Sequence, residues 1–266
     1  MSQIKLFLAI GLISSLVACG GSSGGGSKQP TLPADAVSIT SNNAAAVAES
    51  AISTVESISI IPTIIGVEAN IPLVRIAINT LITNVFNEKN PATSVAAGVT
   101  DSYPCPSDGS ISDTYTFSGD TSYSGTATFS NCNSDGFILN GSFGYSSTWN
   151  NDTGAYSDSG SGSLTTTIGS DSFTMTVDYA ETGNLSSGDY SVQLTYSITG
   201  SVIGGYLVET TQALQGTYPG DVTSGQIIVT GANNTRLRIT VTSSSTADIE
   251  LDSGNGTFVF FGDAFI

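Results

Sequence analysis

From about Val95 to the end of the chain, apolar and polar residues alternate in short runs that are separated by turn-forming dipeptides. The alternation has a period of two, the period at which side chains return to the same face of a β-strand. Residues 190–198 show it most clearly, because Tyr, Val, Leu, Tyr and Ile alternate there with Ser, Gln, Thr and Ser. Such segments are typical of antiparallel strands with one face in the core and the other in water.

Turn signals divide this region into roughly ten to twelve strands. The signals are Asp108-Gly109, Gly119-Asp120, Asp135-Gly136, Gly188-Asp189, Asn233-Asn234 and Gly254-Asn255-Gly256. Their close spacing predicts that consecutive strands pair as a meander. Because an open sheet of this size normally curls, splits or closes, we predict a mainly β fold with a large curved antiparallel sheet or a barrel-like meander.

The segment before the strands has helical periodicity instead. Residues 42–60 predict a helix that Ser41 or Asn42 caps and that Pro62 ends. Its apolar face consists of Val47, Ala48, Ala51, Ile52, Val55 and Ile58. We expect this face to pack on the sheet.

Residues 71–88 predict a second helix, with Pro72 in its first turn. This helix is apolar over most of its circumference and therefore needs a large apolar partner surface. We expect it to lie on the sheet beside the first helix. The side chains that would face a ligand held between this helix and the sheet are Leu73, Ile76, Ala77, Leu81 and Val85.

The first residues have the layout of a secretory signal, with Lys5 as the only charge before an apolar run that ends at Val17. The motif Leu16-Val17-Ala18-Cys19 then resembles the lipobox of bacterial lipoproteins. The resemblance implies that residues 1–18 are a lipoprotein signal peptide and that Cys19 carries acyl chains such as palmitate. Several acyl chains hold a protein stably on a membrane. Gly20 at the next position implies the outer membrane, with the periplasmic and the cell-surface face both left open.

Residues 19–34 are rich in Gly, Ser and Pro and are expected to form a flexible tether behind the anchor. Residues 35–92 then form the two-helix segment, and residues 93–266 form the β domain. We expect these last two parts to fold as one unit.

Composition excludes several functions. After residue 18 the chain holds five basic and 22 acidic residues, a net charge of −17, so it repels nucleic acid. The chain has no histidine, which removes the usual general base and the commonest neutral metal ligand. Paired carboxylates stay possible catalysts, but no local motif marks a pair. We therefore predict a protein that is not an enzyme and has no cofactor.

Cys105 and Cys132 are the two cysteines left after the anchor. In an exported protein they predict a disulfide, because disulfides persist outside the cytoplasm. The loop closed in this way would stabilise the fold by about 3–4 kcal/mol in the chain-entropy model. Free thiols or a metal site are the alternatives, and a metal site would need further Cys or His ligands.

Asp248, Glu250 and Asp252 precede a glycine-rich loop and weakly resemble an oxygen-rich calcium site. The glycine lies one position too late for an EF-hand, and the bidentate Glu at the end of the loop is missing. We favour the alternative that these carboxylates form the wet face of a strand. If residues 236–243 and 247–252 form a hairpin, Arg238 lies near Asp252.

The order of these features resembles a loose group of proteobacterial lipoproteins without known activity. The matching pieces are the lipobox, "ITSNNAAAVAES" (39–50), "TFSNCN" (128–133) and "VTGANNTRLRITV" (229–241). The resemblance implies no catalytic residues.

We therefore predict a membrane-anchored envelope lipoprotein that acts as a structural or interaction module for an envelope protein partner. The alternative is a carrier or sensor of a small hydrophobic ligand held between residues 71–88 and the sheet. An occluded apolar cavity would favour the carrier, and an exposed aromatic patch would favour the interaction module.

Overall fold

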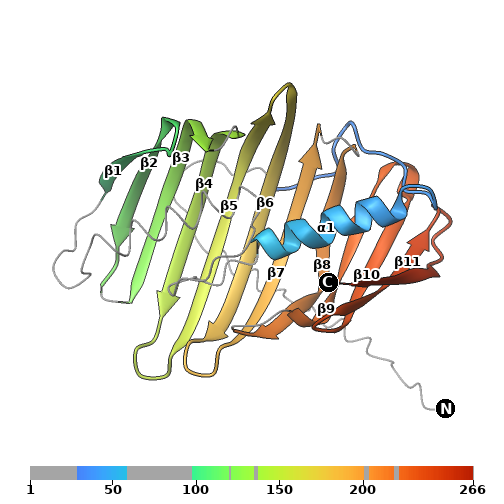
Figure 1. Ribbon diagram of the computed structural model, residues 1–266. Helices are drawn as coiled ribbons and strands as arrows, with labels where there is room; N and C mark the ends of the chain where they lie inside the picture. The colour runs from blue at the N-terminus through green and yellow to red at the C-terminus, as the bar shows by residue number, and fades with distance from the viewer. Residues whose placement is uncertain are drawn as a thin grey trace, which may run out of the picture.

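The computed structural model describes residues 29–58, 98–119, 121–134, 137–200, 204–218 and 222–265. These residues form a mainly β protein in which twelve strands make one antiparallel sheet (Figure 1). The strands are β1 (Val99–Pro104), β2 (Asp108–Phe117), β3 (Ser122–Ser134), β4 (Phe137–Trp149), β5 (Ala155–Ile168), β6 (Asp171–Asn184), β7 (Asp189–Thr199), β8 (Tyr206–Thr217), β9 (Val222–Thr230), β10 (Arg236–Ser243), β11 (Thr246–Asp252) and β12 (Val259–Phe265). A short 3₁₀ turn, η1 (Ala232–Asn234), links β9 to β10.

Spatial order in the sheet follows chain order from β1 to β12, so the predicted meander is confirmed. The sheet is not closed into a barrel: β1 and β12 are its two edges, and among the described strands each pairs with one neighbour. Figure 1 shows that the C-terminal strands curl round toward the side on which the helix lies. The described strands thus form a curved, open sheet that begins at β1 and ends at β12.

The predicted alternation decides which face of the sheet is buried. In β7, Tyr190 and the four alternate residues up to Ile198 are all buried, whereas the residues between them are at least partly exposed. We call the face that carries these buried residues the inner face. The helix α1 (Ala44–Ile58) lies on this face, in front of β7 to β10 (Figure 1).

The helix forms as its apolar spacing predicts. Its buried side chains are Ala44, Val47, Ala48, Ala51 and Val55, and they join one core cluster with β6 to β11. The Tyr196 hydroxyl donates a 2.9 Å hydrogen bond to the Ala51 carbonyl, which ties the helix to β7. The Ser50 and Tyr206 hydroxyls lie 2.8 Å apart and link it to β8.

The predicted cap at Ser41 or Asn42 is wrong. The first helical hydrogen bond runs from the Ala44 N–H to the Thr40 carbonyl, at 2.9 Å. The Asn43 side-chain oxygen reaches back and accepts the Thr40 N–H at 2.7 Å, so Thr40 and Asn43 cap the helix, which begins at Ala44 and not at the predicted residue 42. The described ranges contain one α-helix, and the predicted helix 71–88 lies outside them.

Residues 35–40 attach the start of the described chain to loops at one end of the sheet. Asp35 accepts hydrogen bonds of 2.7 Å from the Thr199 hydroxyl and from the Gly200 N–H. The buried Ile39 donates its N–H to the Thr235 hydroxyl at 2.8 Å. Residues 35–58 therefore share a core with the sheet, while the predicted boundaries after residues 18 and 92 lie outside the described ranges.

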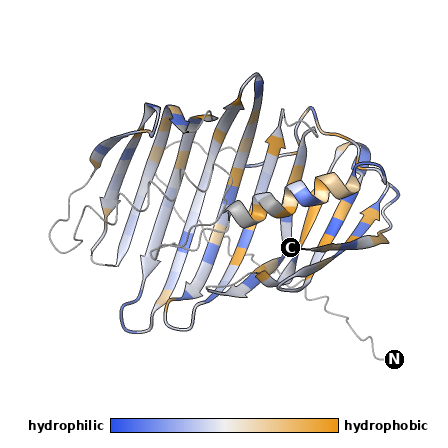
Figure 2. Cartoon of the chain, viewed as in Figure 1, coloured by the Kyte–Doolittle hydropathy of each residue, from blue (hydrophilic) through white to orange (hydrophobic). Residues whose placement is uncertain are grey.

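Hydropathy divides the inner face into two halves. Figure 2 shows hydrophobic colour gathered on α1 and on the strands behind it, whereas β2 to β5 are mostly pale. A second, smaller core cluster lies in this paler half and includes the two cysteines. No helix in the described part of the chain has both the length and the apolar character needed to cross a bilayer.

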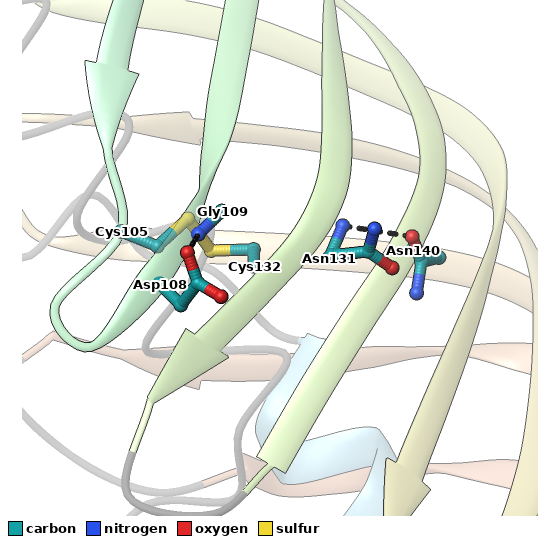
Figure 3. Close-up of a disulfide and its surroundings, with 6 residues drawn as sticks. All are labelled: Cys105, Asp108, Gly109, Asn131, Cys132 and Asn140. Carbon is teal, nitrogen blue, oxygen red and sulfur yellow. Dashed lines mark hydrogen bonds between the residues drawn. A yellow bond between two sulfur atoms is a disulfide. The ribbon is translucent and has the colours of Figure 1, made fainter.

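The predicted disulfide between Cys105 and Cys132 is confirmed, with Cα atoms 5.3 Å apart (Figure 3). The prediction of a turn at Asp108-Gly109 is wrong, because both residues belong to β2. They sit beside a bulge in β3, where Asn131 has a positive φ of 49°. A Cβ atom on Gly109 would overlap the Asn131 carbonyl, so this position needs glycine.

Candidate functional sites

Two of the predicted sites lie outside the described residues. They are the lipidation site Cys19 and the ligand-facing side chains Leu73, Ile76, Ala77, Leu81 and Val85. Both stay predictions. The disulfide is described above. The last predicted site, the carboxylates of β11, lies in the hairpin of β10 and β11 and in the loop that follows it.

The hairpin of β10 and β11 pairs its charges in a different register from the expected one. Arg236 lies opposite Asp252, and Arg238 lies opposite Glu250. The predicted pairing of Arg238 with Asp252 is therefore wrong, and the register differs from it by two residues. The short turn after Ser243 sets this register. Arg236 donates from Nε and Nη2 to Asp252 at 3.1 and 2.7 Å, and Arg238 donates from Nη2 to Glu250 at 2.6 Å.

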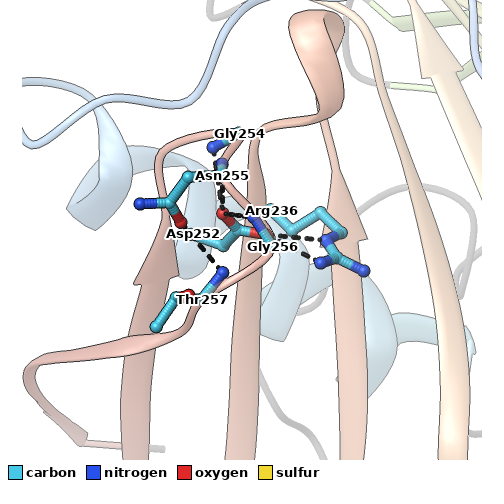
Figure 4. Close-up of polar contacts among 6 residues, drawn as sticks. All are labelled: Arg236, Asp252, Gly254, Asn255, Gly256 and Thr257. Carbon is cyan, nitrogen blue, oxygen red and sulfur yellow. Dashed lines mark hydrogen bonds and ion pairs between the residues drawn. The ribbon is translucent and has the colours of Figure 1, made fainter.

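Asp252 organises the loop that follows β11 (Figure 4). Its Oδ1 atom accepts the N–H groups of Gly254, Asn255 and Gly256, each at 3.0 Å, and its Oδ2 atom accepts Arg236. The Arg236 hydrogen bond holds the pKa of Asp252 below its usual value. This carboxylate is filled by donors, so it offers no free lone pair to a calcium ion.

The other two carboxylates do not assemble a cation site with it. Glu250 is held by Arg238, and Asp248 is exposed opposite Asp263. In the ranges that the structure describes, no three acidic, His or Cys side chains cluster to hold a metal. The preferred alternative, a wet strand face, is wrong for Asp252, whose side chain is fully buried by its loop.

The edge strand β12 exposes three consecutive apolar side chains, which we call the aromatic edge. Val259, Phe260 and Phe261 are 63%, 62% and 37% exposed. A bulge opposite Ile249 and Glu250 leaves Phe261 outside the pairing, so side chains of this edge point to both faces. The preceding Phe258 is held in place under the guanidinium groups of Arg236 and Arg238, 5.0 and 4.4 Å from its ring centre.

A second candidate site lies on the inner face of β1 to β6, where carboxylates stand among tyrosines. Tyr145 donates to both oxygens of the buried Asp113, at 2.8 and 2.9 Å. Tyr115 donates to Asp101 at 2.9 Å. Each of these hydrogen bonds joins two different strands. The tyrosine hydroxyls therefore link the strands of the sheet and also satisfy the carboxylate oxygens.

The same face carries two further acids on the neighbouring strands β5 and β6. Tyr156 donates to Glu181 at 2.6 Å, and the Ser147 hydroxyl donates a short hydrogen bond to Asp158. Glycines make room for the rings: a Cβ atom on Gly125 would lie 2.5 Å from the Tyr145 hydroxyl oxygen. On this face, tyrosine rings therefore occupy space that glycines on neighbouring strands leave open.

Burial changes the acidity of this pair. Glu181 is only 1% exposed, and its desolvation raises its pKa to about 7, with a smaller opposing effect from the Tyr156 hydrogen bond. Burial also raises the pKa of Asp158. The Oε2 atom of Glu181 is buried and has no hydrogen-bond partner in the part of the chain that the structure describes. This atom marks the place where the network is incomplete.

Sequence reasoning missed this network, although a signal was present. In β2, Asp113 falls at the same period-two phase as Ile111 and Tyr115, so an acid occupies a core position. In β6, Glu181 falls in phase with Val177 and Tyr179. A charged residue in the apolar phase of a strand predicts a buried polar contact.

No family model matches this chain, and neither a curated protein nor a solved structure matches it. We therefore infer function from the geometry of the aromatic edge and of the inner face.

Proposed function

We propose that this chain is a lipid-anchored lipoprotein of the outer membrane and that its folded part is a non-enzymatic interaction module of the cell envelope. The lipobox ending at Cys19 supports the anchor. The observation that carries the interaction role is the aromatic edge, a run of exposed apolar side chains on a strand that has one paired neighbour among the described strands.

Natural sheet edges are normally blunted by charge, proline or bulges, because free strand edges recruit other strands. The opposite edge, β1, follows this rule: it contains Asp101 and ends at Pro104. The edge β12 also has a bulge and carries Asp263, but its first two residues, Val259 and Phe260, are exposed apolar side chains on a strand that pairs, within the described residues, with β11 alone. Such a strand is suited to β-strand addition, in which a partner extends the sheet and its side chains cover the apolar ones.

The chemistry of the partner follows from charge. The mature chain has a net charge of −17 under the proposed processing, so a strongly acidic partner would be repelled. We therefore expect an envelope protein that offers an extended, apolar, neutral or basic strand.

The alternative, a carrier for a small hydrophobic ligand between residues 71–88 and the sheet, has weaker support. The apolar half of the inner face is already covered by α1. The other half carries Asp113, Asp158 and Glu181, and a hydrocarbon ligand laid on these acids would exclude water without replacing its hydrogen bonds.

Photocrosslinking in intact cells tests the interaction role. A photoreactive phenylalanine analogue is placed at Phe260 in the full chain. Leu185 is the control position, because it is 58% exposed in the turn between β6 and β7, away from β12. We expect one defined crosslinked product from position 260, none from position 185, and loss of the product when Phe261→Lys is added. Equal products from both positions, or none, would refute the role of β12.

The anchor is tested separately, by the mass of the mature N-terminal peptide and by Cys19→Ser. We expect the natural chain to fractionate with outer membranes and the variant to leave them. A variant that stays in the membrane fraction would count against lipidation while leaving the crosslinking result intact.

A further inference from the structure

Strands β5 and β6 place Asp158 and Glu181 directly opposite each other on the inner face. Directly opposed residues of an antiparallel pair have Cβ atoms about 4.5–5.5 Å apart. Tyr156 and Ser147 approach the two carboxyl groups and donate to one oxygen of each. The four side chains come from three adjacent strands, β4, β5 and β6, all held in regular register.

One oxygen in this group lacks any partner. Glu181 is 1% exposed, and its buried Oε2 atom accepts no hydrogen bond from any of the described residues. The hydrogen bond from Tyr156, a β5 residue, holds the Glu181 carboxyl group over β5, the strand that carries Asp158. A buried carboxylate oxygen without a donor is unstable unless something positively charged or protonated meets it.

No positively charged side chain of the described residues contacts the Glu181 Oε2 atom. The basic side chains there are Arg236 and Arg238, and both are held on β10 by Asp252 and Glu250. The other polar side chains near the pair are tyrosines: Tyr156 on β5, Tyr179 on β6, Tyr123 on β3 and, beside Tyr156, Tyr190 on β7. Val192 of β7 lies opposite Glu181. None of them supplies a positive charge.

We propose that Asp158 and Glu181, with the hydroxyl oxygens of Tyr156 and Ser147, form a binding site for one hard divalent cation of the Ca²⁺ type. Two carboxylates neutralise the charge of such an ion. All the proposed metal-ligand atoms are oxygens, and the chain has no histidine. Both facts favour calcium and magnesium over transition metals. Ca²⁺ fits better than Mg²⁺, because Ca²⁺ tolerates irregular coordination and Mg²⁺ demands a near-ideal octahedron. The site involves other strands than β12 and does not depend on the proposed docking function.

Isothermal titration calorimetry tests the proposal on the mature chain with its disulfide intact, after removal of metals with a chelator and dialysis at pH 8. CaCl₂ is titrated against a background of fixed ionic strength, with MgCl₂ and NaCl as competitors. We expect one ion per chain with a Kd of about 10⁻⁴–10⁻³ M, the range of extracellular calcium modules.

The variant Glu181→Gln removes one ligand charge and nearly keeps the side-chain shape. We expect it to bind at least tenfold more weakly. The matched control is Asp171→Asn, an exposed acid on the same strand β6, and we expect its affinity to stay within twofold of the natural chain. If Glu181→Gln does not fold, Asp158→Asn gives the same test from β5.

No saturable binding by the natural chain would overturn the proposal, whatever the variants do. Equal binding by the natural chain and by a folded Glu181→Gln or Asp158→Asn would overturn it as well, since the ion would then sit elsewhere on this acidic surface. Either result leaves the crosslinking test of β12 unaffected.

Discussion

The buried carboxyl of Glu181 makes a stability prediction whose size can be worked out from the structure. Desolvation raises the pKa of this group from 4.5 to about 7. One pKa unit corresponds to about 1.4 kcal/mol, so the shift amounts to roughly 3 kcal/mol. Since the shift is upward, the folded state holds its proton more tightly than the unfolded chain does.

The sign of the pH dependence follows. Below about pH 4.5 the group is protonated in both states, and its full contribution to the free energy of unfolding is present. As the pH rises toward 7, the unfolded chain releases the proton first, so stability falls, and the loss is nearly complete above the folded pKa. Burial raises the pKa of Asp158 as well, which acts in the same direction.

Replacing Glu181 by Gln removes this titration. We expect the free energy of unfolding at pH 5 to stay within about 1 kcal/mol of the natural value, because the amide oxygen can still accept the Tyr156 hydrogen bond. At pH 8.5 the variant should be more stable than the natural chain by up to about 3 kcal/mol. Removing the ionisable group thus stabilises the protein at high pH only.

The measurement is urea unfolding at the two pH values, followed by the fluorescence of Trp149, the single tryptophan of the chain. A chelator keeps the solution free of divalent ions, and Asp171→Asn serves as the exposed-acid control. The reasoning is refuted if Glu181→Gln loses the same stability at both pH values, or if it gains none at pH 8.5 relative to pH 5.

Two further predictions concern the polar half of the inner face. Replacing Cys105 and Cys132 by Ser should lower the free energy of unfolding by about 3–4 kcal/mol, read from the urea midpoint; a midpoint unchanged from the natural chain would show that the crosslink does not constrain the unfolded state. Gly125→Ala should cost about 1–3 kcal/mol, because its methyl group would displace the Tyr145 hydroxyl from Asp113. Gly144→Ala is the control, since the nearest atom to its added methyl lies 3.7 Å away, and equal melting temperatures for the two variants would contradict the argument.

The parts of the fold that sequence predicts are those whose signal is local. The alternation in β7 predicts which side chains are buried because neighbours two residues apart share a face. The buried side of α1 follows in the same way from its spacing. The disulfide was predictable by elimination, because two cysteines remain once Cys19 is assigned to the proposed lipid anchor.

The parts that sequence did not predict depend on register between strands. Arg236 faces Asp252 because the turn after Ser243 is short, and a turn two residues longer would have paired Arg238 with it. The contact of Tyr145 with Asp113 spans from β4 to β2 across Gly125. No spacing within one strand encodes such a contact, because it requires the pairing of three strands to be known first.

The unpartnered oxygen of Glu181 is unusual in this protein, because nearly all other buried polar side-chain atoms of the described residues have hydrogen-bond partners. Among the buried side-chain nitrogen and oxygen atoms of the described residues, two have no partner, Glu181 Oε2 and Asn133 Oδ1. The amide of Asn133 is neutral and lies beside the β3 bulge, where an irregular ladder leaves polar groups unmatched. Glu181 lies instead in an unbroken stretch of the β5–β6 ladder and belongs to an acid, opposite a second acid. In the other two buried acids, Asp113 and Asp252, both carboxylate oxygens accept hydrogen bonds from a tyrosine, an arginine or backbone N–H groups. Glu181 accepts a hydrogen bond at Oε1 alone, and its Oε2 atom has the environment expected of a position that a cation fills.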